Sequence, residues 1–405
     1  MRIATANSYD TTVSTLSKRQ SELSDLQERI STGKRVLRAS DDPVAAVLSE
    51  ATQNRLSRVE ADKRSLETSR TSLNQAESAL GEAGELIQDV RELVIAAGNA
   101  TYGSKEYLSI AQEIEGLRDR LIGVANQKDS AGRTLFGGLG GSSSPFVEVY
   151  GPGSSGVRFD GQRGQEATGN NSLPQAMDGE AIWMRVPPGN GSFTLDLPAT
   201  NTGSVRADTG QVSNPSLVTG HDYSITFADV AGVMQYSVTD ATTGSPVAGA
   251  TDMPYTPGTT VEFDGVAFQL QGTPTAGDSV ELKAVTTPTD MFKVMQDTID
   301  ALRGATTGQS AQLVHALGRS LSELDAGHDR VLSARSQTGA WLNRADAIEG
   351  LLSDRAVAHE AEKSSLEDLD MVKGISDFKS MEVGLQAAMQ AYASVQKLSL
   401  FQYVG

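Results

Sequence analysis

Apolar residues recur at helical spacing near both ends of the chain and lose that spacing in the middle. One series runs from Val13 to Ile30, a second from Val59 to Val94, and a third from Val314 to Leu352. Residues spaced by three, four and seven positions lie on one face of a helix. One helix cannot bury such a stripe alone, so we expect the two end regions of the chain to pack against each other.

The second series predicts a long helix that begins at Pro43 and continues to about Ala97. Large residues repeat every seven positions, and small or β-branched residues follow the later ones by three: Val59, Leu66, Leu73, Leu80, Ile87 and Val94, with Ala76, Ala83, Val90 and Ala97. A seam sustained over several heptads requires partner helices. Residues 98–103 then predict a turn, and a shorter amphipathic helix over 107–124 should fold back antiparallel on the long one.

A short hinge separates the first two helical patterns. Gly33 is predicted to end the first helix, because glycine readily takes the left-handed conformation found just past a helix. Asp42 is the predicted N-cap of the next helix and Pro43 its first residue, where a missing N–H costs nothing. Helix capping is therefore a simpler interpretation of the Asp41–Asp42 pair than a metal or acid site.

Lys34, Arg35 and Arg38 form a basic cluster within this hinge. Two interpretations are open for them. They are either a solvated hinge or a set of salt bridges to acidic groups on neighbouring subunits, which a chain with a net charge of −17 offers in number.

The middle of the chain has the composition of a β domain. Twelve of the thirteen prolines fall between Pro145 and Pro288, and short runs of alternating polar and apolar residues replace the helical pattern. Such runs, separated by Gly, Pro, Asn and Asp, predict an antiparallel β domain. The expected fold class is α+β multidomain: a long antiparallel helical coiled coil or bundle built from both chain ends, with an inserted all-β domain.

Three domains follow from these boundaries. Residues 1–42 with 362–405 are expected to form an inner coiled-coil terminal domain, and residues 43–144 with 289–361 a helical bundle domain. Residues 145–288 are expected to form the inserted β domain.

Composition limits what the protein can bind. The negative net charge disfavours a nucleic-acid partner, because binding to DNA or RNA depends on attraction to phosphates. The absence of cysteine excludes disulfides, thiolate metal sites and a cysteine nucleophile. We expect no cleavable signal peptide, because the first residues lack an apolar core, and no membrane insertion, because no apolar run is long enough.

No constellation of residues predicts catalysis, and we expect neither a cofactor nor a metal. Gly151–Gly156 matches G-x-G-x-x-G, yet strand residues follow it where a dinucleotide site needs a helix, so a flexible loop is the preferred interpretation. The four histidines show no close ligand spacing: His221, His315, His328 and His359. Of these, His328 occupies a heptad position and is expected in an interface or a polar core site.

Three segments carry a resemblance to a known family. They are residues 26–35 with Ser40–Pro43, residues 125–138 with the run Gly-Arg-Thr-Leu-Phe-Gly-Gly, and residues 385–401 near the C-terminus. In this pattern and in its layout, with helical ends and a β middle, the chain resembles the flagellin superfamily of bacterial axial proteins. The glycine-rich loop, the Ser-Leu-Phe-Gln-Tyr ending and residues 157–161 resemble the branch that forms the junction between hook and filament.

The resemblance implies a structural, extracellular role in the bacterial flagellum. It implies self-assembly into a ring or helical layer, contact with hook-associated protein 1, and a surface on which flagellin polymerises. It also implies type III export with a chaperone that binds the C-terminal helix. The alternatives are a filament flagellin and, in another class, an intracellular coiled-coil adaptor.

The apolar stripes and the hinge supply the predicted contact residues. The predicted subunit interface comprises Leu16, Leu23, Leu26, Ile30, Arg35, Arg38, Leu385, Met389, Tyr392, Leu398, Leu400 and Phe401. The predicted export-chaperone site comprises Leu385, Met389 and Tyr392.

Overall fold

The computed structural model describes residues 2–140, 142–151, 154–165, 173–305 and 310–404. Seven helices are present in these ranges: α1 (Arg2–Thr32), α2 (Pro43–Ala97), α3 (Ser104–Ala125), α4 (Gly179–Trp183), α5 (Met291–Gly304), α6 (Ala311–Glu367) and α7 (Met371–Val404). The chain divides into two compact units, residues 1–65 with 347–405 and residues 66–346. The long helices α2 and α6 contribute to both units.

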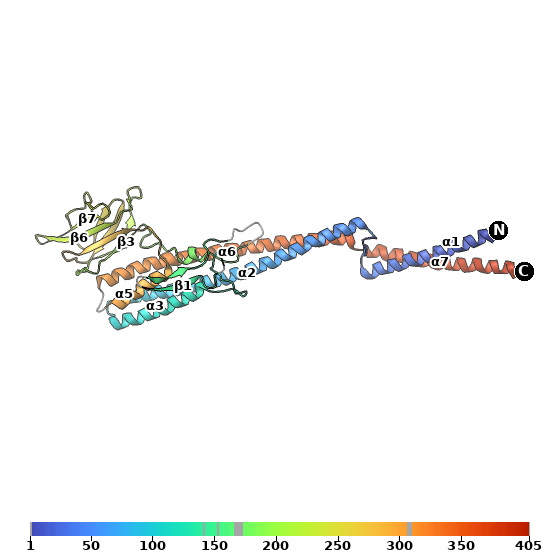
Figure 1. Ribbon diagram of the computed structural model, residues 1–405, viewed down its shortest axis with the longest axis horizontal. Helices are drawn as coiled ribbons and strands as arrows, with labels where there is room; N and C mark the ends of the chain where they lie inside the picture. Colours follow the sequence, from blue (N-terminus) through green and yellow to red (C-terminus); the bar gives the residue numbers. More distant parts are fainter. Residues whose placement is uncertain (1, 141, 152–153, 166–172, 306–309, 405) are drawn as a thin grey trace. The chain divides into compact units, whose positions relative to one another are not determined.

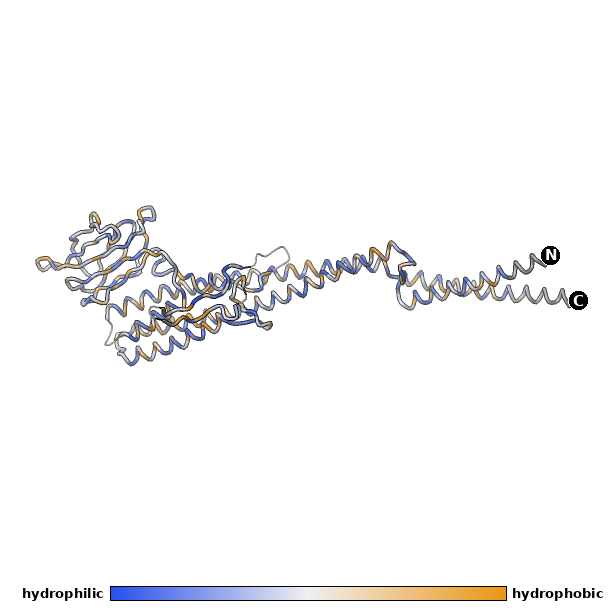
Figure 2. The backbone as a smooth tube through the Cα atoms, viewed as in Figure 1, coloured by the Kyte–Doolittle hydropathy of each residue, from blue (hydrophilic) through white to orange (hydrophobic). Residues whose placement is uncertain are grey.

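In the first unit the two chain ends lie side by side. Helices α1 and α7 contact each other and run antiparallel, so that both termini lie at the same end of the pair (Figure 1). Orange apolar positions recur among blue hydrophilic ones along the long helices, as the sequence pattern predicts (Figure 2).

The second unit contains two separate hydrophobic cores. The helical core is formed by α2, α3, α5 and α6, and includes the heptad residues Leu80, Ile87 and Val94 at 1% exposure or less. The β core is formed by residues between Phe193 and Leu282. The heptad pattern thus identified the buried face of α2 correctly.

The inserted strands form two sheets over the β core. A six-stranded antiparallel sheet has the order β3-β12-β6-β7-β8, with β9 also paired to β7, and a four-stranded sheet has the order β10-β11-β4, with β5 also paired to β11. The strands are β3 (Phe193–Asp196), β4 (Arg206–Ala207), β5 (Gln211–Val212), β6 (Tyr223–Val230), β7 (Val233–Asp240), β8 (Ser245–Pro246), β9 (Met253–Pro254), β10 (Thr259–Phe263), β11 (Val266–Gln271) and β12 (Ser279–Ala284). The predicted fold class, helical ends with an inserted antiparallel β domain, is confirmed.

The structure divides the predicted β region, 145–288, between the two cores. The hairpin of β1 (Phe146–Gly151) and β2 (Ser154–Phe159) packs on the helical core, as does the short helix α4. Phe146 and Trp183 are both fully buried there. Only the later strands surround the β core, because their apolar faces meet one another rather than the helices.

Candidate assembly surfaces

The hinge between α1 and α2 has the capping geometry that the sequence predicts. Helix α1 ends at Thr32, and Gly33 follows in the left-handed region with φ of 72°. The Oδ1 atom of Asp42 accepts a hydrogen bond from the Ala45 N–H at 3.0 Å, which is the N-cap contact of α2. The Leu369 N–H donates to the Gly33 carbonyl at 2.8 Å and ties the hinge to the start of α7.

The basic cluster of the hinge binds acidic groups of its own chain. Lys34 Nζ lies 2.8 Å from Glu367 Oε2, and Arg35 Nη1 lies 3.0 Å from Asp42 Oδ2. Arg38 is farther from its partner, with 3.8 Å between Nη2 and Glu28 Oε2. The hinge is therefore an organised set of in-chain contacts and not a simple solvated link.

Asp41 helps to fold this hinge. Its Oδ2 atom accepts hydrogen bonds from the backbone N–H groups of Leu37 and Arg38, both at 3.0 Å. These bonds, that of Arg38 first, lower the pKa of Asp41. Asp41 thus caps one loop while Asp42 caps a helix, and neither carboxylate is arranged as a metal ligand. In the ranges given above, no group of three or more His, Asp or Glu side chains could hold a metal ion.

The interface between α1 and α7 is only half-buried in a single chain. Leu16, Leu23, Leu26 and Ile30 of α1 are all partly exposed, and so are Leu385 and Tyr392 of α7. Met389 is 49% exposed. The predicted contacts at Leu398, Leu400 and Phe401 lie outside the residues whose side chains the structure describes.

A second apolar surface lies on α7 beside the face that contacts α1. It consists of Val372, Ile375, Val383 and Met389, and is called the α7 flank below. Their exposed fractions are 83%, 49%, 64% and 49%. At about 3.6 residues per turn, the four side chains fall within roughly a third of the helix circumference. An apolar surface of this kind, left open in one chain, is typical of a site for protein contacts.

The glycine-rich loop after α3 places an apolar plug in the helical core. Leu135 and Phe136 are 1% and 0% exposed, and the Phe136 ring meets the Trp183 ring edge-on with centroids 5.8 Å apart. Asp129 holds the loop: its Oδ1 atom accepts the Arg133 N–H at 2.8 Å and its Oδ2 atom lies 2.8 Å from Arg133 Nη2. Trp183, the partner of this plug, was not predicted from the sequence.

The histidines have protein partners and are not gathered together. His221 Nδ1 lies 2.8 Å from Asp240 Oδ2, and His359 Nδ1 lies 3.5 Å from Glu362 Oε2. The Nε2 atom of His328 accepts a hydrogen bond from the Gln88 side-chain amide at 3.3 Å, between two helices of the bundle.

Comparison with known proteins identifies the family. Residues 3–140 match the bacterial flagellin N-terminal helical region, and residues 198–284 match the D2-like domain of flagellar hook-associated protein 1. Flagellar hook-associated protein 3 of Escherichia coli K12 is 27% identical over 409 residues, which cover 99% of each chain. The chain is thus homologous over its full length to a protein of the flagellin superfamily.

Solved structures and flagellins show which members of that superfamily the chain resembles. The crystal structure of flagellar hook associated protein-3 from Legionella pneumophila matches with a TM-score of 0.71 and 25% identity, over 78% of this chain and 98% of the other. A flagellin of Bacillus subtilis is 32% identical, but over only 31% of this chain and 42% of its own. The chain is thus homologous to a hook–filament junction structural protein, which confirms the predicted function, and filament flagellin is only a distant relative.

These relatives are structural components of the flagellum, in agreement with the prediction of a protein that is not an enzyme. Among the helices that the structure describes, none is both long enough and apolar enough to cross a membrane.

Proposed function

We propose that the chain is a structural subunit at the junction of hook and filament, and that it assembles through α1, α7 and the hinge. The observation that carries this proposal is the α7 flank, an apolar surface left open by a helix pair that is itself only half-buried. Burying one large aliphatic side chain stabilises a complex by roughly 1.5–3 kcal/mol. Four such side chains per subunit, repeated around a ring, give a contact that no single chain can make.

The partners of this subunit are other copies of itself, hook-associated protein 1 and flagellin. The full-length similarity to hook-associated protein 3 supports this assignment. We place the protein outside the cell as part of the flagellum, with no enzymatic activity and no cofactor. In this proposal residues 1–42 with 362–405 form the inner layer, and residues 43–144 with 289–361 form the helical layer. Within the predicted insert, residues 145–288, the strands around the β core form the exposed part, while β1, β2 and α4 belong to the helical layer.

In this proposal the hinge makes contacts within its own chain and also takes part in the contacts between subunits. Arg35 and Arg38 remain proposed interface residues, together with Leu16, Leu23, Leu26 and Ile30 of α1. Because both arginines already contact carboxylates of the same chain, their contribution is to fix the direction in which α1 leaves α2. A fixed hinge presents the α1–α7 pair to its neighbours in one orientation.

The C-terminal helix is also the proposed binding site of an export chaperone. Leu385 and Tyr392 are seven residues apart and Met389 lies between them, which suits a helix bound in an apolar groove. Leu398, Leu400 and Phe401 belong to the proposed interface as well. Before export the chaperone would cover the surface that later meets other subunits.

The experiment compares two substitutions on exposed positions of α7. Met389→Asp places a carboxylate on the α7 flank, whereas Ala391→Asp places one on an exposed position outside the flank as a matched control. Both should leave the melting temperature of the monomer within about 2 °C of the unaltered chain, since both sites face water. Cells with Met389→Asp should make hooks, shed flagellin into the medium and lack filaments, while cells with Ala391→Asp should swim.

A chaperone defect would look different from an assembly defect. Secreted Met389→Asp protein in the medium, without filaments, supports an assembly surface. Protein retained in the cell, together with weaker binding to the export chaperone, would point to the chaperone site instead. Normal filaments on cells that carry only Met389→Asp would contradict the proposed function of the flank.

A further inference from the structure

A row of polar side chains on α6 faces the inserted β domain. It consists of Gln312, His315, Arg319 and Glu323, which follow each other at spacings of three and four and so lie on one face of the helix. Gln312 Nε2 donates to the Asn201 carbonyl at 3.1 Å. Below, these four residues are called the α6 row.

The other end of the α6 row makes charged contacts. Arg319 Nη1 lies 2.7 Å from Asp196 Oδ1 on β3, and Arg319 Nε lies 2.9 Å from Glu323 Oε1. The same Glu323 oxygen accepts the Gly189 N–H at 3.0 Å, just before the β domain begins. The helical core and the β core are separate clusters, so this row of polar contacts joins them.

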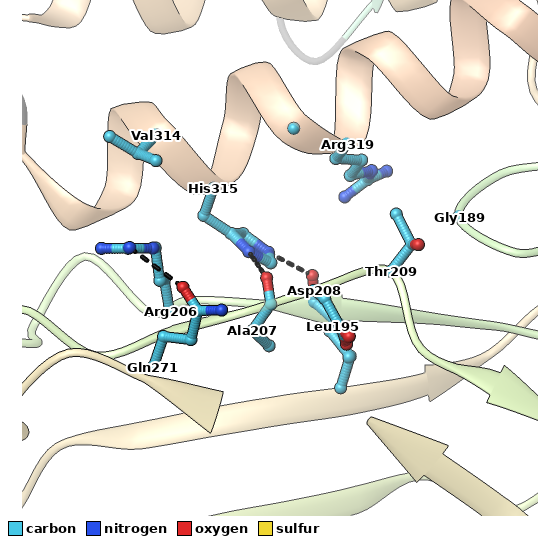
Figure 3. Close-up of a pocket in the computed structure, with 11 residues that line it drawn as sticks. Gly189, Leu195, Arg206, Ala207, Asp208, Thr209, Gln271, Val314, His315 and Arg319 are labelled. Atoms are coloured by element: carbon cyan, nitrogen blue, oxygen red, sulfur yellow. Dashed lines mark hydrogen bonds between the residues drawn. The ribbon is translucent and has the colours of Figure 1, made fainter. Parts of the chain in front are cut away.

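His315 occupies the centre of the row and reaches both sheets of the β domain. Its Nδ1 atom lies 3.0 Å from the Ala207 carbonyl oxygen on β4, and its Nε2 atom lies 2.6 Å from the Leu195 carbonyl oxygen on β3 (Figure 3). Strands β3 and β4 belong to different sheets. One imidazole ring therefore ties α6 to the six-stranded and the four-stranded sheet together.

The two contacts together require a proton on each of the two ring nitrogens. A backbone carbonyl oxygen can only accept a hydrogen bond. A neutral imidazole carries one N–H and one lone pair, so one of its two nitrogens would face a carbonyl oxygen lone pair to lone pair. Only the imidazolium ion donates from both nitrogens. The Nδ1 distance of 3.0 Å lies within the usual range of N–H···O hydrogen bonds, and the Nε2 distance of 2.6 Å is slightly shorter than that range.

The charges around the ring are consistent with a cation at this position. Carboxylates come from β3, from the segment after β4, from α5 and from α6: Asp196, Asp208, Asp297 and Glu323. Cations come from β4, β12 and α6: Arg206, Lys283 and Arg319. Glu281 on β12 also pairs with Lys283, so the carboxylates of this group outnumber its cations.

The interface is not closely packed at this point. A cavity of about 330 Å³ opens beside the ring, lined by Arg206, Thr209 and Gly318 among others (Figure 3). Apolar packing therefore does not replace the hydrogen bonds of His315 if they are lost.

We propose that protonated His315 fixes the β domain to α6 through its two hydrogen bonds. When the ring loses a proton, the β domain becomes more mobile relative to α6. Histidine is the side chain whose ordinary titration falls between pH 5 and 8. The β domain is then firmly placed in mildly acidic medium and gains freedom as the medium becomes alkaline. The strands themselves keep their fold, because their core does not include the histidine.

Histidine-selective ¹⁵N labelling of the full-length protein tests the protonation state directly. The chain has only four histidines, and His315→Gln identifies the signal of interest by its disappearance. At pH 6 we expect both nitrogens of His315 to carry protons in the folded protein. A neutral ring at pH 6, with the β domain still docked, would overturn the proposal.

Two spin labels test whether the protonation of His315 restricts the motion of the β domain relative to α6. The chain has no cysteine, so Asp329→Cys on α6 and Thr243→Cys in the β domain provide two unique labelling sites, both exposed. The distance distribution should be narrow at pH 5.5 and clearly broader at pH 8.5. In His315→Gln it should be broad at both pH values.

The matched control is His328→Gln on the same helix. His328 contacts Gln88 of α2 and not the β domain, so this variant should keep the pH-dependent width of the unaltered chain. An unaltered chain whose distance distribution is equally narrow at both pH values would overturn the proposal. So would a His315→Gln variant that retains the pH response.

Discussion

Arg35 binds in two directions within the hinge. Its Nη1 atom lies 3.0 Å from Asp42 Oδ2, and its Nη2 atom donates to the Leu366 carbonyl oxygen at 2.7 Å. One guanidinium therefore joins the residue that caps α2 to the last turn of α6. Arginine suits this role because its rigid planar guanidinium presents N–H donors on two sides, whereas the lysine ammonium is a compact point charge.

The two hinge arginines should consequently differ in their effect on folding. Arg35→Glu places a carboxylate beside Asp42 and near Glu367, and should lower the free energy of unfolding by about 1 kcal/mol, since both partners are partly exposed. Arg38→Glu should have almost no effect, because its side chain is 73% exposed and 3.8 Å from its partner. Thermal unfolding of both variants checks this, with shear-induced loss of filaments as the assembly readout. Equal melting temperatures for the two variants would contradict it.

The folded protein should become more stable on mild acidification because of Asp290. It is the N-cap of α5, with Oδ1 accepting the Lys293 N–H at 2.7 Å, and burial raises its pKa to about 6. An unfolded aspartate titrates near 3.9. The folded chain therefore binds this proton more tightly, and the contribution of Asp290 to stability rises as the pH falls from above 6 towards 4.

Asp290→Asn should remove this dependence and keep the cap, because asparagine caps helices as well as aspartate does. At pH 7.5 the variant should be more stable than the unaltered chain by on the order of 1–2 kcal/mol. At pH 4 the difference should be close to zero. Urea unfolding at the two pH values measures it, and a variant that is less stable at pH 7.5 would show that the charged carboxylate is needed.

The β core should be removable without loss of the helical core. The chain leaves and returns to the helical core at Val186 and Thr289, which exchange two backbone hydrogen bonds of 2.8 and 2.9 Å. Further out, the Val285 N–H donates to the Ser192 carbonyl at 3.0 Å. Replacing residues 193–284 with a short Gly/Ser linker should leave the thermal transition of the helices in place.

A larger excision provides the contrast. Replacing residues 151–288 also removes Val157, Trp183 and Val186 from the helical core. Loss of a buried tryptophan alone costs about 3–5 kcal/mol. This variant should melt at a clearly lower temperature than the smaller excision. If both melt alike, the β1–β2 hairpin and α4 do not stabilise the helices.

Two glycines of the loop after α3 should respond differently to alanine. Both have positive φ, 80° at Gly132 and 70° at Gly138. A Cβ atom at Gly132 would meet open space, whereas one at Gly138 would lie 1.9 Å from the Gln162 carbonyl oxygen. Gly132→Ala should cost about 1 kcal/mol from backbone strain.

Gly138→Ala must in addition move the backbone at Gln162. Its cost should therefore exceed that of Gly132→Ala by at least about 2 kcal/mol. Urea unfolding of the two variants, followed by tryptophan fluorescence, measures the difference, because the loop lies over Trp183. Similar unfolding midpoints would mean that the loop can open without cost.

The helical part of the fold could be predicted because its signal is periodic. Leu73, Leu80 and Ile87 recur every seven residues, and a repeat of that length has only one structural explanation in a chain with helix formers between the apolar positions. Capping is similarly local, so the roles of Gly33 and Asp42 could be predicted from their neighbours alone.

The division of the β region could not be predicted in the same way. Phe146 and Phe193 stand in runs with the same alternating pattern, yet the first is buried against the helices and the second inside the β core. Alternation shows that one face of a strand is buried but not which surface covers it. Trp183 lies in a helix of only five residues, too short for any periodicity to appear.

The contacts of His315 could not be predicted from the sequence either. Its partners are the backbone carbonyls of residues 195 and 207, and a carbonyl is present at every position whatever the side chain. The in-chain partners of Arg35 could not be predicted for a related reason. Leu366 is 331 positions away in sequence and also contributes a carbonyl oxygen.

The adjacent backbones at Val186 and Thr289 also bear on how such a chain changes during evolution. The fold of the helical core requires only that the segment between Val186 and Thr289 begin and end within hydrogen-bonding distance. Any domain whose first and last strands are neighbours satisfies that condition. The match of residues 198–284 to a domain of hook-associated protein 1, on a chain whose N-terminal helices match flagellin, is what recombination at this point would leave behind.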